Sequence, residues 1–384
     1  MEGESAVLST GMMQRNTAYD AIRSLAIVLV IGIHVLDGMS YSTTMGSNAS
    51  IGGLSWTLQT VCMVLGRLGV PFFFFLSGAL MLNRELEYDK DYLLKRVLPL
   101  YLNAVIWTFG YFLYKVFENH EAVYPVKLVS LFIRSCTLDR DAAPHLWYMS
   151  VIVAIYLFLP LMTKLVRICS TKMLINMAAL SAMVFSFAPT FNRFLHVSEV
   201  AEAINFTMPN FRDGMLITLY PMYMLIGYLI KEREILKRAK SWMLALAGLA
   251  CVGGVTLLQW ECYVKKSTQY IYNLWYDNIF ILGAGIAFFG LMSRLPTPVK
   301  PVKLVLTSLS RLSYGVYYIH FVLYRLFRSR IQLLQWALAP KVTAVVICTL
   351  LTSWGIVFIL SKVPVVNRLL FNIRTTPQGR KERI

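Results

Sequence analysis

Residues 19–34 read Tyr-Asp-Ala-Ile-Arg-Ser-Leu-Ala-Ile-Val-Leu-Val-Ile-Gly-Ile-His and begin a hydrophobic run that continues to Gly38. A run of this length is typical of a helix that crosses a lipid bilayer. It carries Arg23 near its start and His34 a little past its middle. Ionisable side chains at membrane depth are costly, so they indicate a functional role by default.

The spacing of Arg23 and His34 places both side chains on one face of this helix. Their eleven-residue separation is close to three helical turns, which puts them about 16 Å apart along the axis. The helix would therefore present an anion-binding group near one membrane surface and a candidate base near mid-membrane. The alternative is a flanking arginine and a histidine bonded to a neighbouring helix.

The composition predicts a membrane protein built from helices. Hydrophobic residues make up 57% of the 384-residue chain, charged residues make up 15%, and the mean hydropathy is +0.58. The apolar runs have the length of spanning helices, which excludes short barrel strands. We predict an all-α, polytopic membrane protein with about ten transmembrane helices. The expected spans are 21–38, 57–82, 97–117, 146–163, 173–190, 214–230, 241–260, 275–293, 312–335 and 342–362.

The net charge of +17 is explained by orientation in a membrane, so no nucleic acid partner is expected. Segments on the same side as the N-terminus hold about twice as many Lys and Arg as the opposite segments, which predicts that both termini are cytoplasmic. The membrane domain then covers 19–363, between a tail at 1–18 and a basic tail at 364–384. The six cysteines are scattered without a Cys/His ligand pattern, so we expect no metal site.

One basic cluster opposes this orientation because it falls on the outer side. Either it binds an anionic acceptor or lipid headgroups, or the ninth span is misplaced. The cluster consists of Arg325, Arg328, Arg330 and Lys341.

The second span carries Arg67, followed at residues 68–78 by Leu-Gly-Val-Pro-Phe-Phe-Phe-Phe-Leu-Ser-Gly. Arg67 lies about 15 Å into its helix, where an isolated guanidinium is costly. Pro71 and the neighbouring glycines allow a bend and close helix approach. Arg67 either pairs with a carboxylate, for which Asp37 is a candidate, or contacts a ligand. Carboxylates are scarce in the spans, which favours the ligand.

Two further motifs place one histidine at the start of the fourth span and another within the ninth span. Pro144-His-Leu-Trp-Tyr-Met-Ser150 opens the fourth span; His145 and Trp147 fit an interface anchor or the lining of an acceptor pocket. In Leu312-Ser-Tyr-Gly-Val-Tyr-Tyr-Ile-His320, His320 is expected at a depth similar to that of His34. The two histidines either share a polar cavity, or His320 is a satisfied core residue.

Together these motifs resemble acyltransferase family 3, integral-membrane O-acyltransferases that modify bacterial surface glycans. The resemblance covers roughly residues 19–320 and rests on four motifs in order, including Asp20-x-x-Arg23 with the histidine that follows it. The His-Leu-Trp-Tyr element is most similar to the branch that contains the enterobacterial common antigen O-acetyltransferase. The chain departs from the family at its Arg-x-x-Arg element, where Leu93 stands at the first position and Arg96 at the second.

The resemblance implies a multi-pass protein of the bacterial inner (plasma) membrane that uses acetyl-CoA or another acyl-CoA as donor. The acceptor would be a glycan or a lipid-linked sugar, with membrane lipid as the surroundings and no metal cofactor. The basic residues Arg23, Lys95 and Arg96 would bind the CoA phosphates, and His34 would be the general base. Arg67 would stabilise the oxyanion or position the acceptor. Substrate-binding roles fall to His145, Trp147, His320 and Ser77.

The main rival is a transporter or flippase of a glycan or lipid precursor, which would also need many spans and buried His and Arg. Against it, the sequence shows no internal repeat and no obvious pair of discontinuous helices. A third alternative is an inactive relative that serves as an assembly partner. Direct acyl transfer is favoured over an acyl-enzyme because no Ser or Cys has an evident base and orienting partner.

Overall fold

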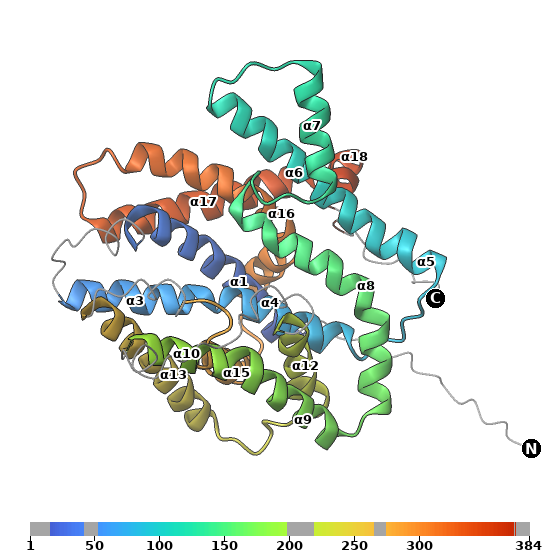
Figure 1. Ribbon diagram of the computed structural model, residues 1–384, viewed down its shortest axis with the longest axis vertical. Coiled ribbons are helices and arrows are strands. Elements are labelled where there is room, and N and C mark those ends of the chain that lie inside the picture. Colours follow the sequence, from blue (N-terminus) through green and yellow to red (C-terminus); the bar gives the residue numbers. More distant parts are fainter. Residues whose placement is uncertain (1–15, 42–52, 198–218, 265–273, 372, 374–384) are drawn as a thin grey trace, which may run out of the picture.

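The computed structural model describes residues 16–41, 53–197, 219–264, 274–371 and 373, and their regular structure is entirely helical (Figure 1). The all-α prediction is therefore confirmed for these residues. The predicted tails fall mostly outside them.

Helix α1 (Thr17–Leu36) is the central element of the fold. The side chain of Asn16 caps it by accepting a hydrogen bond from the Ala18 amide. Its C-terminal end passes into a π-helical turn at Asp37–Tyr41, a geometry that is frequent at functional sites. Because α1 packs against α3, α4, α16 and α17, its polar face is enclosed by protein.

The other helices follow in chain order. They are α3 (Gly53–Arg67), α4 (Gly69–Met81), α5 (Lys90–Tyr92), α6 (Leu98–Glu118), α7 (Pro125–Cys136), α8 (Trp147–Ile168), α9 (Thr171–Ala182), α10 (Ala188–Val197), α12 (Leu219–Glu232), α13 (Ser241–Val264), α15 (Ile279–Met292), α16 (Lys300–Ile331), α17 (Leu338–Leu360) and α18 (Pro364–Val366).

Seven helical segments of the described residues are long and apolar enough to cross a membrane. They match seven of the predicted spans and make this a multi-pass membrane protein. The three other predicted spans correspond to α12, α15 and α16, but residues 275–278 and 332–335 of the predicted eighth and ninth spans are not helical. However, α12 and α15 have 14 residues each, and α16 carries charged residues along its 32-residue length. The seven segments are Thr17–Met39, Trp56–Met81, Lys90–Glu118, Pro144–Ile168, Thr171–Leu195, Ser241–Cys262 and Leu338–Leu360.

The second span is interrupted at Leu68, between α3 and α4. The amide of Leu68 bonds to the Leu65 carbonyl, so the chain makes one tighter turn before α4 begins. Arg67 therefore lies in the last turn of α3, where the negative end of the helix dipole stabilises a cation.

Two glycines allow α4 and α12 to touch backbone to backbone. A Cβ at Gly78 would lie 1.8 Å from the Met224 carbonyl oxygen, and one at Gly227 would lie 2.0 Å from that of Phe75. No side chain fits at either position, and small residues at helix interfaces permit this approach in membranes. The contact fixes the aromatic segment of α4 that follows Arg67.

Helix α16 starts at Lys300, twelve residues before the predicted ninth span. Its first half packs on α1, where Asp20 accepts hydrogen bonds from the hydroxyls of Ser310 (2.7 Å) and Thr307 (3.2 Å). Hydropathy alone missed this half because Lys300, Lys303 and Arg311 lower its apolar score. At the other end Arg325 forms a 2.8 Å ion pair with Glu118 of α6.

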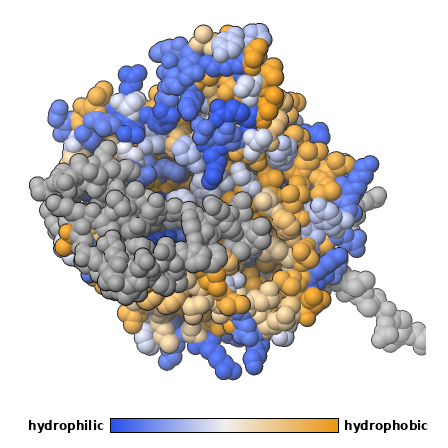
Figure 2. Space-filling model, viewed as in Figure 1, coloured by the Kyte–Doolittle hydropathy of each residue, from blue (hydrophilic) through white to orange (hydrophobic). Residues whose placement is uncertain are grey.

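Helix α7 lies between the third and fourth predicted spans, where no helix was predicted. At 12 residues it is too short to span, and hydropathy gave no signal for it. Many large hydrophobic side chains elsewhere are exposed, as contact with lipid requires. Figure 2 shows hydrophobic residues across the right half of this face and hydrophilic residues at its top and along its right edge.

Candidate active site

Three histidines from distant parts of the chain meet beside the C-terminal end of α1. The ring centroid of His34 lies 5.5 Å from that of His320 and 6.2 Å from that of His145, and the last two are 5.1 Å apart. His145 comes from the short turn that precedes α8, and His320 comes from α16. The structure thus brings the two expected histidines together and adds His145 to them.

The three rings are held in different ways. His320 is fully buried, with Nδ1 2.5 Å from the Tyr317 backbone oxygen. His145 is 2% exposed and stacks on Phe321 at a centroid distance of 4.6 Å. Both ring nitrogens of His145 are buried, without a hydrogen-bond partner among the described residues. His34 is half-buried and lines a cavity, so it is the most accessible of the three.

The His34 cavity has a volume of about 270 Å³. A guanidinium, a carboxylate, two imidazoles and several aromatic rings surround it. Such a mixture of apolar surface with a few polar groups is typical of a small-molecule site. Its lining includes His34, Asp37, Arg67, His145, Trp275 and Tyr276.

Arg67 contacts the aromatic wall of this cavity. Its guanidinium carbon lies 5.1 Å from the ring centroid of Trp275 and 5.7 Å from that of Tyr276. Within the described ranges no carboxylate forms an ion pair with Arg67. Cation–π contact with these rings and the negative end of the α3 dipole stabilise the positive charge of Arg67. The guanidinium is therefore available to bind an oxygen in the cavity.

Trp147 also belongs to the His34 cavity. Its ring lies 5.6 Å from that of Tyr276 and 5.5 Å from that of Tyr220, centroid to centroid. The structure therefore places Trp147 with the expected pocket residues, packed against the aromatic wall that contacts Arg67.

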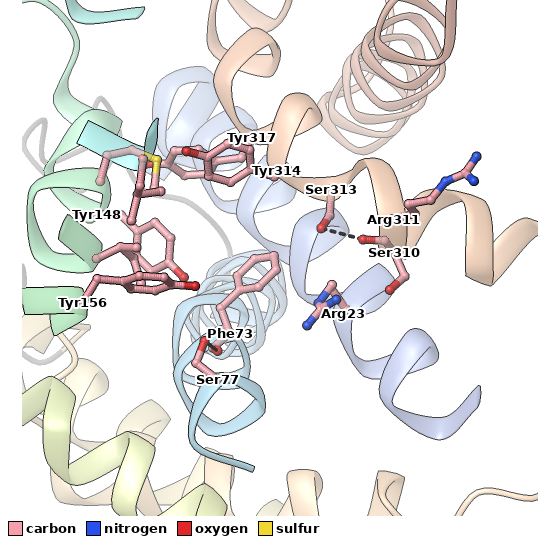
Figure 3. Close-up of a pocket in the computed structure, with 13 residues that line it drawn as sticks. Arg23, Phe73, Ser77, Tyr148, Tyr156, Ser310, Arg311, Ser313, Tyr314 and Tyr317 are labelled. Atoms are coloured by element: carbon pink, nitrogen blue, oxygen red, sulfur yellow. Dashed lines mark hydrogen bonds between the residues drawn. The ribbon is translucent and has the colours of Figure 1, made fainter. Parts of the chain in front are cut away.

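A second cavity, of about 210 Å³, lies toward the N-terminal end of α1 and is named here the Arg23 cavity. Figure 3 shows Arg23 and Arg311 on one side of it and the tyrosines of α8 on the other. Ser77 lines it too, although its hydroxyl donates a 2.8 Å hydrogen bond to the Phe73 carbonyl. The polar members are Arg23, Ser77, Tyr148, Tyr156, Ser310, Arg311, Ser313, Tyr314 and Tyr317.

Lys95 and Arg96 do not line either cavity. They lie in a π-helical turn, Leu93–Val97, that leads into α6. Lys95 is exposed and forms an ion pair with Asp91. Leu100, in the first turn of α6, lines the Arg23 cavity. Lys95 and Arg96 precede it in the chain and lie outside the lining of this cavity.

No pattern in the sequence marks the residues that complete these cavities. Trp275 and Tyr276 precede α15 in an ordinary aromatic cluster, and Tyr148 and Tyr317 have the pattern of interface or core tyrosines. A buried ion pair between Arg193 of α10 and Asp277 was missed as well. Arg193 and Asp277 are 84 positions apart in the sequence, so no local spacing reveals that they pair.

The family model of an acyltransferase domain matches residues 16–358. This range includes every helix that lines the two cavities. The chain belongs to acyltransferase family 3. No curated protein and no solved structure gave a match.

This acyltransferase therefore has two cavities placed along one helix. The Arg23 guanidinium lines the first cavity, whereas the exposed side chain of Arg311 points away from it (Figure 3). His34, His145 and Arg67 line the second cavity. Across the described part of the chain, no group of three or more His, Cys, Asp or Glu is arranged to hold a metal ion. The chemistry available is that of an imidazole base beside a cation.

The Arg193–Asp277 pair is expected to fix the loop that presents Trp275 and Tyr276 to Arg67. Both side chains are under 10% exposed, and removing one partner of a buried pair costs about 3–5 kcal/mol. We expect Asp277→Ala to lower the thermal midpoint of the purified protein markedly. The double variant Arg193→Met, Asp277→Leu should recover most of the loss, because it leaves no buried charge unpaired. A double variant no more stable than the single one would contradict this prediction.

Proposed function

We propose that this acyltransferase moves a short acyl group, normally acetyl, from a cytoplasmic acyl-CoA to a hydroxyl of a cell-surface glycan or lipid-linked sugar. The observation that carries the proposal is His34 in a cavity that it shares with Arg67 and an aromatic wall. The His145-Leu-Trp-Tyr element of that cavity also supports kinship with the enterobacterial common antigen branch.

The donor would enter at the Arg23 cavity. Arginine suits phosphate because its planar guanidinium forms paired, charge-assisted hydrogen bonds. The serine and tyrosine hydroxyls of this cavity suit the amides of the pantetheine arm. We further propose that the chain has about ten spans and that it lies in a bacterial inner membrane with both termini in the cytoplasm. Lys95 and Arg96 would then attract the nucleotide phosphates of the donor as it approaches the Arg23 cavity.

The acceptor would enter the His34 cavity, where sugar faces stack on Trp147, Trp275 and Tyr276. His34 takes the proton of the acceptor hydroxyl as its oxygen attacks the thioester carbonyl carbon. Arg67 stabilises the negative charge that develops on the carbonyl oxygen. The C–S bond then breaks, the new ester bond remains, and CoA leaves as a thiolate that receives the proton from His34.

The first experiment measures free thiol from acetyl-CoA with purified protein in detergent, with and without a fraction of surface glycan. We expect thiol release that depends on the glycan and matches the ester formed. A transporter or flippase would release no thiol. An absence of thiol with every acceptor tested, for a folded protein, would contradict the proposal.

The role of Arg23 can be tested by the donor that the variant prefers. We expect Arg23→Ala to raise the KM for acetyl-CoA by about 10- to 100-fold, the effect of losing hydrogen bonds to a charged group. S-acetyl-pantetheine lacks the nucleotide phosphates, so its KM should be the same in the variant and the parent. The exposed Arg330 is the matched control. An equal rise of KM for both donors would assign Arg23 to another role.

A further inference from the structure

Two tyrosines form the wall between the cavities. Tyr148 of α8 and Tyr317 of α16 are the residues that line both the Arg23 cavity and the His34 cavity. Their ring centroids are 5.4 Å apart with an interplanar angle of 56°. Rings at this distance are in van der Waals contact, so the two spaces are closed from each other at this point.

The two halves of the wall are held to different degrees. The Tyr317 hydroxyl donates a hydrogen bond to the His145 backbone oxygen, and its ring packs beside those of His145 and His320. The Tyr148 ring contacts Phe73 and Phe74 at centroid distances of 6.2 and 5.2 Å. The Tyr148 hydroxyl forms no hydrogen bond within the described part of the chain. Tyr317 is thus anchored and Tyr148 is held by ring packing alone.

Figure 3 places Tyr148 beside Tyr156, with Arg23 across the cavity. A donor bound by its phosphates at Arg23 would therefore carry its acyl end toward Tyr148. The distance along α1 from Arg23 to His34 is about 16 Å, and the tyrosine wall lies on that route. The acyl group reaches His34 only if one of the two rings turns aside.

The proposed chemistry makes such a wall useful. An imidazole base activates water as readily as it activates a sugar hydroxyl. Attack by water would form a bond from its oxygen to the carbonyl carbon and break the C–S bond, giving acetate, CoA thiol and a proton. Both cavities are large enough to hold water. Without a wall, the base and its water would stand open to the thioester even when no acceptor is bound.

We propose that the Tyr148 ring is a specificity-determining element that keeps the thioester from the base until the acceptor has displaced water from the His34 cavity. This proposal rests on the proposed function. Tyr148 moves and Tyr317 stays, because only Tyr317 is fixed by a hydrogen bond. The barrier is the ring itself, so the hydroxyl of Tyr148 is dispensable. Exclusion of water from a closed site is a recognised way to suppress side reactions.

The test compares acetate formed without acceptor and ester formed with acceptor, from the same amount of acetyl-CoA and purified protein. We expect Tyr148→Ala to raise acceptor-independent hydrolysis by about tenfold or more, and to lower the ratio of ester to acetate. Tyr148→Phe should behave like the parent. Tyr156→Ala is the matched control, because Tyr156 lines only the Arg23 cavity; it should change the KM for the donor without raising hydrolysis.

Two results would overturn this role. One is unchanged hydrolysis in a Tyr148→Ala protein that is folded and binds acetyl-CoA; the other is equal hydrolysis in Tyr148→Ala and Tyr148→Phe. If Tyr148→Ala does not fold, Tyr148→Leu retains apolar bulk and should give a smaller rise. A parent protein that releases no thiol with any acceptor would contradict the proposed function, whereas a parent that transfers acetyl while Tyr148→Ala does not leak contradicts only the role of Tyr148.

Discussion

Alanine in place of His34 is expected to reduce acyl transfer by about 10²- to 10⁴-fold, the usual effect of losing a general base. His34 is the most accessible ring of the histidine cluster and lines the cavity that contains Arg67. His145 and His320 are 2% and 0% exposed and cannot replace it without moving. The measurement is the steady-state rate of ester formation at saturating acetyl-CoA.

Folding must be separated from chemistry in this experiment. Binding of acetyl-CoA and the thermal midpoint of His34→Ala should stay close to those of the parent, because the donor is expected to bind at the Arg23 cavity. His34→Gln keeps the size of the side chain and should be equally inactive. His120→Ala serves as control, since His120 lies in an exposed turn after α6. Turnover near the parental rate in His34→Ala would refute the assignment of the base.

Replacement of Arg67 by methionine is expected to lower kcat by about 10²- to 10³-fold, the effect of removing a donor to an oxyanion. Methionine preserves the length and the apolar contact with Trp275 while removing the charge. The KM for acetyl-CoA should change little, because Arg67 does not line the Arg23 cavity. Separate measurement of kcat and KM for both substrates decides the outcome.

The lysine variant sharpens the interpretation of Arg67. Arg67→Lys retains a positive charge and loses the planar stacking on Trp275 and Tyr276. It should recover part of kcat if charge on the carbonyl oxygen is what matters. A loss confined to the KM of the acceptor, in both variants, would show that Arg67 positions the acceptor and takes no part in oxyanion stabilisation.

The relative placement of Arg23 and His34 was predictable from sequence because both residues lie on one helix. Helix length and hydropathy located seven spans among the described residues, and the spacing of Arg23 and His34 depends only on helical geometry. The similar depth expected of His320 rested on the same rise per residue, counted from Arg311. The family followed from motifs that are continuous in the chain.

The closure of the site was not predictable because it depends on contacts between helices. Tyr148 and Tyr317 are 169 positions apart, and tyrosines are common at membrane interfaces and in helix cores. Trp275 and Tyr276 give no periodic signal, because they belong to a turn before α15. The early start of α16 was missed because Lys300, Lys303 and Arg311 lower the hydropathy of its first half.

The separate origins of the two cavity walls have an evolutionary consequence. The turn before α15 supplies Trp275 and Tyr276 to the His34 cavity and supplies no residue to the Arg23 cavity. Substitutions in that turn can therefore change the lining of one cavity while the lining of the other is inherited intact. Under the proposed function, a new acceptor would be accommodated by new side chains at this turn, without rebuilding the transmembrane scaffold.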